Sequence, residues 1–142
     1  MKITICGSMR FAKEMHDAYK FLREKGHDVF LPEFVIEFVE GKLDWEMGSL
    51  NSEEGAEKKK EHNLIYKHYQ KIKESDAILI INSEKNNIKN YIGANTLIEM
   101  GFAHVLNKKI YLLNGLPEFE YLLAEVKAMG PIILDGKLEK IE

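Results

Sequence analysis

The chain has 142 residues, 45% of them hydrophobic, which is enough for one domain with a substantial core. Its 20 basic and 23 acidic residues give a net charge of −3, and its lysines are scattered, so we expect no surface for a nucleic-acid polymer. The start of the chain has no features of a secretion signal and no apolar run approaches about 18 residues, so we expect a cytoplasmic protein without a membrane segment.

Strand-like and helix-like stretches alternate along the chain. The patterns predict strands at 2–6, 27–31, 76–82, 109–113 and 131–134, and helices at 11–25, 57–74, 95–106 and 118–129. Nearly continuous apolar strands such as 77–81 are typical of a parallel sheet covered by helices on both faces. We therefore predict an α/β fold in one domain over residues 1–142, with a doubly wound sheet of five parallel strands.

The first predicted strand breaks at Gly7 and leads into Ser8 and Arg10. Backbone N–H groups of such a turn favour an anion, and a guanidinium suits phosphate oxygens. The alternative is a plain strand-to-helix turn in which Ser8 caps the helix and Arg10 is solvated. Ligands of doubly wound sheets bind beyond the carboxyl ends of the strands, which would bring residues 7–10 and 82–96 to one ligand site.

Two segments interrupt the alternation. Residues 32–56 form a long, acidic, irregular excursion that contains Trp45, which is typical of a lid, a partner contact or a mobile loop. Its apolar residues would permit docking of another protein and fit contacts between subunits better. Residues 83–92 form a polar loop, either over the ligand site or simply solvated.

Glu99 lies about one turn into the helix that follows the third strand. The helix dipole would favour its ionised form, which suits a nucleophile that attacks a sugar carbon. The alternative is a capping box, in which Glu99 bonds back to the amide of Thr96 and has no chemical role.

These segments together resemble a known enzyme family. The motifs Cys6-Gly7-Ser8-Met9-Arg10, Thr96-x-x-Glu99-x-Gly101-x-Ala103 and Asn107-Lys108-Lys109-Ile110 are similar to those of the nucleoside 2-deoxyribosyltransferase superfamily, closest to its deoxynucleoside 5′-monophosphate N-glycosidase branch. The resemblance implies a flavodoxin-like three-layer sandwich, Glu99 as the nucleophile, and a deoxyribose bound against residues 7–10. It also implies a homodimer or higher oligomer in which the neighbouring subunit completes the pocket.

The resemblance extends the set of candidate site residues. Substrate-binding candidates are Cys6, Gly7, Ser8, Met9, Arg10, Asn82, Gly93, Asn95, Thr96, Tyr121 and Glu125. Tyr121 and Glu125 would project from one helix face toward the neighbouring subunit, or form an ordinary surface pair.

Two positions depart from the family pattern. His68 stands where relatives carry an aspartate, and it is either a second catalytic group, with a pKa near ~6.5, or a packed histidine. Gly93 stands where relatives carry a serine or aspartate that contacts phosphate or ribose, which puts that contact in doubt.

We expect no metal and no cofactor. His16, His27, His62, His68 and His104 show no ligand spacing, and one cysteine allows neither an internal disulfide nor a cysteine-based zinc site. Cys6 has no histidine beside it in the sequence, which favours a buried apolar role over a nucleophile.

Two hypotheses of function follow. The first is an enzyme that cleaves or transfers the N-glycosidic bond of a deoxynucleoside or its 5′-monophosphate, with a small-molecule substrate. The second is a module of the same fold that binds nucleotides without turnover.

Overall fold

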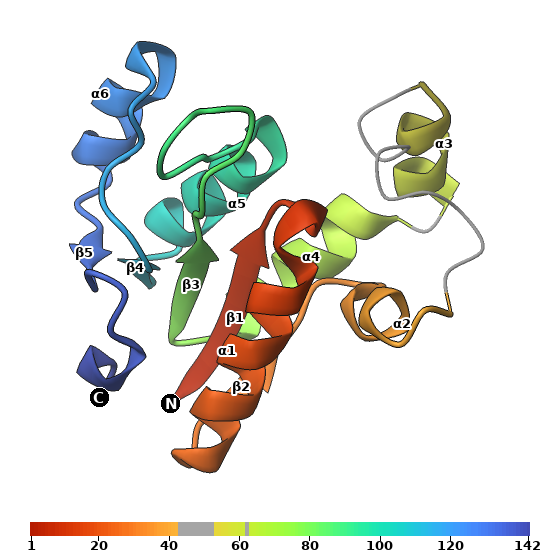
Figure 1. Ribbon diagram of the computed structural model, residues 1–142, viewed down its shortest axis with the longest axis horizontal. Coiled ribbons are helices and arrows are strands. Elements are labelled where there is room, and N and C mark those ends of the chain that lie inside the picture. Colours follow the sequence, from red (N-terminus) through yellow and green to blue (C-terminus); the bar gives the residue numbers. More distant parts are fainter. Residues whose placement is uncertain (43–52, 62) are drawn as a thin grey trace.

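The computed structural model describes residues 1–42, 53–61 and 63–142 (Figure 1). Its five strands are β1 (Lys2–Gly7), β2 (Asp28–Phe30), β3 (Ala77–Ile81), β4 (Lys109–Leu112) and β5 (Ile132–Ile133). All neighbouring strands pair in parallel, in the order β2-β1-β3-β4-β5. This is the flavodoxin-like order, so the predicted doubly wound parallel sheet is confirmed.

The α-helices of the described residues are α1 (Ala12–Glu24), α2 (Val35–Val39), α3 (Glu53–Glu61), α4 (Leu64–Glu74), α5 (Ala94–Val105) and α6 (Glu120–Ala128). Short 3-10 helices lie at Met9–Phe11 and Leu138–Lys140. The single helix predicted over 57–74 is wrong. Asn63 has left-handed backbone angles (φ 52°, ψ 44°), which a right-handed helix cannot contain, so α3 and α4 are separate helices.

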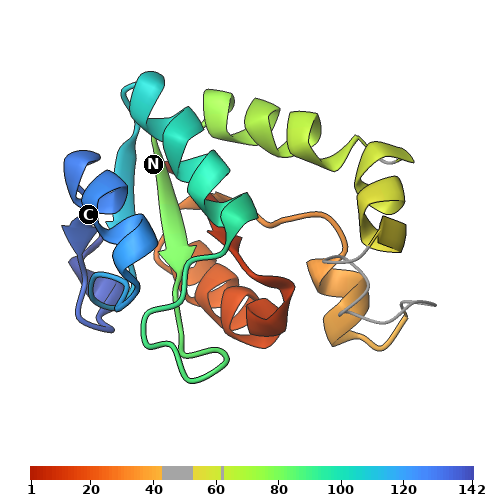
Figure 2. The same ribbon diagram turned by 90° about the horizontal axis from the view of Figure 1, so that it is seen from above.

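Helices cover both faces of the sheet, and alternate side chains of the strands form two apolar cores. Ile3, Ile5 and Leu79 pack with α1, whereas Ile78 and Ile80 pack with α4, α5 and α6. Figure 2 shows α1 on one side of the sheet and α4 and α5 on the other. Because every side chain of β3 is buried, the continuous apolar run in the sequence is explained.

The predicted excursion over 32–56 contains two helical pieces, α2 and the beginning of α3. Its residues 43–52, Trp45 among them, lie outside the described residues, as does His62. Within the described part of the chain, no helix combines the length and apolarity that a membrane span requires.

Candidate functional site

A cavity lies at the switch point of the sheet, where β1 and β3 are neighbours and the chain leaves them in different directions. It is a small, partly open cavity with a volume of about 70 Å³. Residues of β1, the 3-10 helix after it, the β2–α2 connection, α3, α4 and α5 line it. They are Gly7, Met9, Pro32, Glu33, Phe34, Lys59, Leu64, Ile65, His68, Asn95 and Glu99.

Glu99 projects from α5 into this cavity and is only 7% exposed. Its Oε1 accepts a hydrogen bond from Nδ2 of Asn95 at 3.1 Å, and its Oε2 lies 3.6 Å from Nε2 of His68. Helix α5 begins at Ala94 with Gly93 as its N-cap, so Thr96 lies inside the helix. The capping-box alternative for Thr96 and Glu99 is therefore wrong.

Burial decides the protonation of Glu99. It raises the pKa of the carboxyl group to about 8, although a hydrogen bond from Cys6 and the charge of Lys59 act in the opposite direction. The expected ionised form of Glu99 is therefore not the one that this structure favours, because burial penalises the charged carboxylate. At neutral pH Glu99 carries a proton here.

His68 projects from α4 and is 6% exposed. Burial, and then the charge of Lys71, lower the pKa of its imidazole to about 3. The ring is therefore neutral at pH 7, whereas the sequence suggested an ordinary pKa. His68 is both packed and part of the cavity wall, so the two alternatives left open by the sequence are not exclusive.

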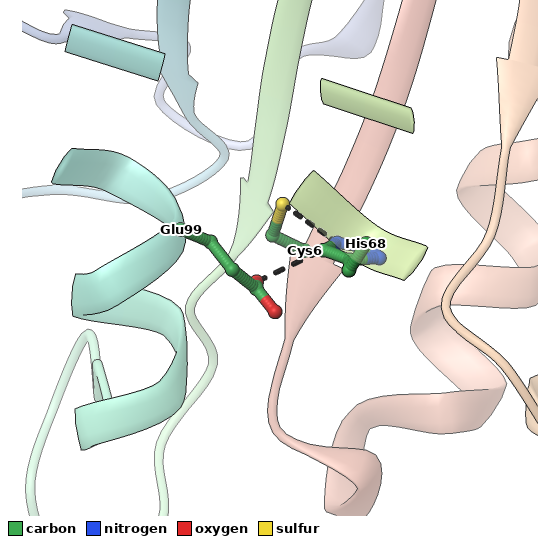
Figure 3. A group of neighbouring side chains, drawn as sticks. All are labelled: Cys6, His68 and Glu99. Atoms are coloured by element: carbon green, nitrogen blue, oxygen red, sulfur yellow. Dashed lines mark hydrogen bonds and ion pairs between the residues drawn. The ribbon is translucent and has the colours of Figure 1, made fainter. Parts of the chain in front are cut away.

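Cys6 is fully buried on β1, and its Sγ lies 3.3 Å from Nε2 of His68. Burial, and then Glu99, raise the pKa of its thiol well above the ordinary value. Figure 3 shows Cys6, His68 and Glu99 pointing toward one another from three elements. The absence of a neighbouring histidine in the sequence was misleading, since the two residues lie 62 positions apart.

The turn after β1 makes the cavity's edge. A Cβ on Gly7 would lie 2.9 Å from the backbone oxygen of Ile81, so this glycine permits the close approach of β1 and β3. The Ser8 hydroxyl accepts a hydrogen bond from the amide of Arg10 at 3.4 Å and caps the following 3-10 helix. Ser8 therefore forms the helix cap that was expected for a plain strand-to-helix turn. Gly7 and Met9, on either side of it, line the cavity.

Arg10 lies outside the main cavity and lines a second, more open one beside it. That cavity is lined by Arg10, Phe11, Glu14, Ser83, Glu84, Lys85 and Asn86. Nζ of Lys85 donates to the Ser8 hydroxyl at 3.2 Å and lies 4.7 Å from the centre of the Tyr91 ring. Burial, and then the charge of Arg10, lower the pKa of Lys85. The loop after β3 thus brings a second cation to the Gly7–Arg10 turn.

Other candidates lie away from the cavity. Asn82 is fully buried, and its side chain bonds the amide of Asn114 and the carbonyl of Gly115 at 2.9 Å each. It joins the segments after β3 and β4 and lines neither described cavity, so its contact with a substrate stays a prediction. Thr96 is buried and outside the cavity lining. A Cβ on Gly93 would lie 3.3 Å from the Tyr91 ring, so the glycine leaves room for that ring.

Tyr121 and Glu125 are exposed on α6 and line neither described cavity. With 86% of Tyr121 exposed, the placement is compatible with a contact to a second copy, which stays a prediction.

Sequence reasoning missed Phe34, Lys59 and Lys85. Phe34 has a left-handed backbone (φ 72°), which is rare for a bulky residue and is typical of strained positions at functional sites. Lys59 was hidden in a run of three lysines, and Lys85 in a polar loop. Single aromatic residues and lysines form no recognisable sequence motif. Only the polar composition of the loop after β3 could have indicated one of these residues, Lys85.

Comparisons with known proteins point to the same class of fold. No family model matches the chain, and no curated protein matches it by sequence. A 2-deoxyribosyltransferase from the psychrotolerant bacterium Bacillus psychrosaccharolyticus is 23% identical, with a TM-score of 0.52 over 79% of this chain and 71% of that one. The CMP N-glycosidase BcmB of Clostridium botulinum is 20% identical, with a TM-score of 0.56 over 99% of this chain and 98% of that one.

At these identities the likeness establishes the fold. The chain shares the three-layer α/β fold of these two proteins, as the sequence resemblance predicted.

Proposed function

We propose that this protein is an enzyme that cleaves the N-glycosidic bond of a nucleoside or nucleoside 5′-monophosphate, by hydrolysis or by transfer of the sugar. The observation that carries the proposal is the Glu99 carboxyl group, which faces a cavity at the switch point of the sheet and is held between Asn95 and His68. The two structural neighbours, a 2-deoxyribosyltransferase and a CMP N-glycosidase, support it because both are named for chemistry at this bond.

The pair of His68 and Glu99 can generate the nucleophile. Transfer of the carboxyl proton to Nε2 of His68 yields a carboxylate and an imidazolium across the 3.6 Å contact. The carboxylate attacks the anomeric carbon as the bond to the base breaks, and the imidazolium protonates the leaving base. Water then attacks the same carbon and releases Glu99, while neutral His68 accepts the water proton and returns it to the carboxylate.

The apolar wall of the cavity suits the base and sugar. Met9, Phe34, Leu64 and Ile65 line it, and such surfaces bind flat rings while excluding water from the reacting carbon.

The second cavity favours a nucleoside 5′-monophosphate over an unphosphorylated nucleoside as the substrate. Arg10 and Lys85 line it together, and Lys85 bonds the hydroxyl of Ser8, whose neighbours Gly7 and Met9 line the main cavity. Two cations beside a sugar site suit a phosphate dianion.

The test is release of free base from CMP, dCMP, the other ribo- and deoxyribonucleoside 5′-monophosphates and the unphosphorylated nucleosides, followed by chromatography. A second free base added to the mixture distinguishes transfer from hydrolysis. We expect Glu99→Gln to lower the rate by at least about 10³-fold with binding largely kept, because the amide cannot form the ester with the sugar. Turnover by Glu99→Gln at the parent rate would contradict the nucleophile.

A binding module without turnover is the second candidate. The protonated state of Glu99 and the absence of the family's aspartate at His68 favour it. Binding of several nucleotides without release of base from any of them would establish this alternative.

A further inference from the structure

The cluster of Cys6, His68 and Glu99 combines a thiol, an imidazole and a carboxyl group. One ligand atom from each side chain lies within 4.8 Å of the other two, and all three residues are buried. They come from β1, α4 and α5, so the tertiary fold assembles them (Figure 3). Within the described part of the chain, no other group of three such residues comes together.

Two of the three distances between these atoms fit a tetrahedral zinc ion. Zinc lies about 2.3 Å from sulfur and about 2.0–2.2 Å from nitrogen or oxygen, so its ligand atoms are separated by about 3.3–3.6 Å. In this structure Sγ of Cys6 is 3.3 Å from Nε2 of His68, and this nitrogen is 3.6 Å from Oε2 of Glu99. Little movement of the side chains is therefore needed for both pairs to bind one ion.

The chemistry of the ligands selects the ion. Thiolate and imidazole are ligands for zinc, whereas magnesium and calcium prefer sites made of oxygen atoms. A thiolate, a carboxylate and a neutral imidazole balance the two charges of the cation, which suits a buried site. We infer that Cys6, His68 and Glu99 form a zinc-binding site.

The surroundings of the cluster provide the remaining features of such a site. Asn95 holds the other oxygen of Glu99 at 3.1 Å and would fix the carboxylate as an outer-shell partner. His68 and Glu99 line the main cavity, which gives the ion a path of entry and an open fourth position. If Glu99 is the nucleophile of the proposed function, zinc on Oε2 blocks its attack, so zinc would inhibit base release.

Binding is tested without any assay of activity. The full-length protein is freed of metal with a chelator, which is then removed, and titrated with Zn²⁺ against a chromophoric chelator and separately with Co²⁺. We expect one ion per chain and a cobalt spectrum of tetrahedral intensity with a thiolate-to-cobalt charge-transfer band. Cys6→Ser and Glu99→Gln should each weaken zinc binding by more than about 100-fold, and Asn95→Ala by about 10-fold, the scale for an outer-shell partner.

The controls address histidines elsewhere. His27 lies 3.1 Å from the N-terminal amine and could bind zinc with it, and His104 is exposed on α5. His27→Asn and His104→Asn should leave the charge-transfer band and the affinity unchanged. Equal affinity of the parent, Cys6→Ser and Glu99→Gln would overturn the site.

The parent protein alone also tests the proposal, so a variant that fails to fold does not prevent a result. A cobalt spectrum of the parent without the thiolate band would overturn the zinc site. The zinc site and the proposed function fail separately. If the thiolate band is present and zinc does not slow base release, the zinc site stands and Glu99 is not the nucleophile.

Discussion

His68 and Glu99 come from different helices, and their Nε2 and Oε2 atoms lie 3.6 Å apart in a place nearly closed to water. Burial opposes charge on both, because it raises the pKa of the carboxyl group and lowers that of the imidazole. The contact is therefore between two neutral groups at pH 7, and not the ion pair that its distance alone suggests. One proton shift converts it into a nucleophile and an acid.

Replacement of His68 by asparagine tests this proton transfer. We expect His68→Asn to lower the rate constant of base release by about 10²–10⁴-fold, the usual contribution of acid–base catalysis, with KM changed much less. The exposed His104→Asn is the matched control and should behave like the parent. If His68→Asn releases base at a rate within about twofold of the parent, His68 has only a packing role.

The stability of the metal-free protein should depend on pH through Glu99. Between pH 4.5 and about 8 the folded protein keeps a carboxyl proton that the unfolded chain has lost, so stability falls as the pH rises. His68 acts oppositely between about 3 and 6.5, where the unfolded chain takes up a proton that the folded protein does not. The two effects on stability cancel in part between pH 4.5 and 6.5, and between pH 6.5 and about 8 only Glu99 of these two groups contributes.

We therefore expect the free energy of unfolding to fall from pH 6.5 to pH 8, by at most about 1.4 kcal/mol per pH unit. Glu99→Gln should remove most of this fall. Urea unfolding of both proteins at the two pH values, with a chelator present, measures the difference. The same pH dependence in both proteins would mean that Glu99 has an ordinary pKa in the fold.

Arg10 and Lys85 are predicted to bind the phosphate of the substrate. Arg10→Ala and Lys85→Ala should each weaken binding of a nucleoside monophosphate by about 10-fold or more and leave the free nucleoside nearly unaffected, since each removes one charge-assisted contact. Lys89→Ala, in the same loop, is the control because its side chain is exposed and lines neither cavity. Equal losses for both ligands would show that the residues do not select the phosphate.

Tyr121 is predicted to complete the pocket of a second subunit. If it does, mixing Arg10→Ala chains with Tyr121→Ala chains restores one intact site in each mixed dimer, and activity rises above that of either variant alone. The unmixed variants at the same total concentration are the control, and light scattering reports the oligomeric state. Failure of the mixture to recover, in a confirmed dimer, would remove Tyr121 from the site.

Local patterns along the chain are enough to predict the fold class. The periodicity and length of the hydrophobic stretches predicted the five strands and most helices. The strands are recognisable because a buried parallel strand such as 77–81 must be apolar throughout. The sequence also singled out Glu99 and His68 through their resemblance to a family, and both line the cavity. It failed at Asn63, where one left-handed residue divides a helix that propensity alone would continue.

The chemistry of the cavity depends on contacts that exist only in the folded chain. Protonation depends on desolvation and on neighbours within a few ångströms, which sequence spacing does not report. The contact of Cys6 with His68 joins positions 62 residues apart, and the hydrogen bonds of Asn82 show that a polar residue at a strand end serves the fold. Local pattern therefore decided where the elements lie, whereas the packing of β1, α4 and α5 decided which side chains meet and which of them carry charge.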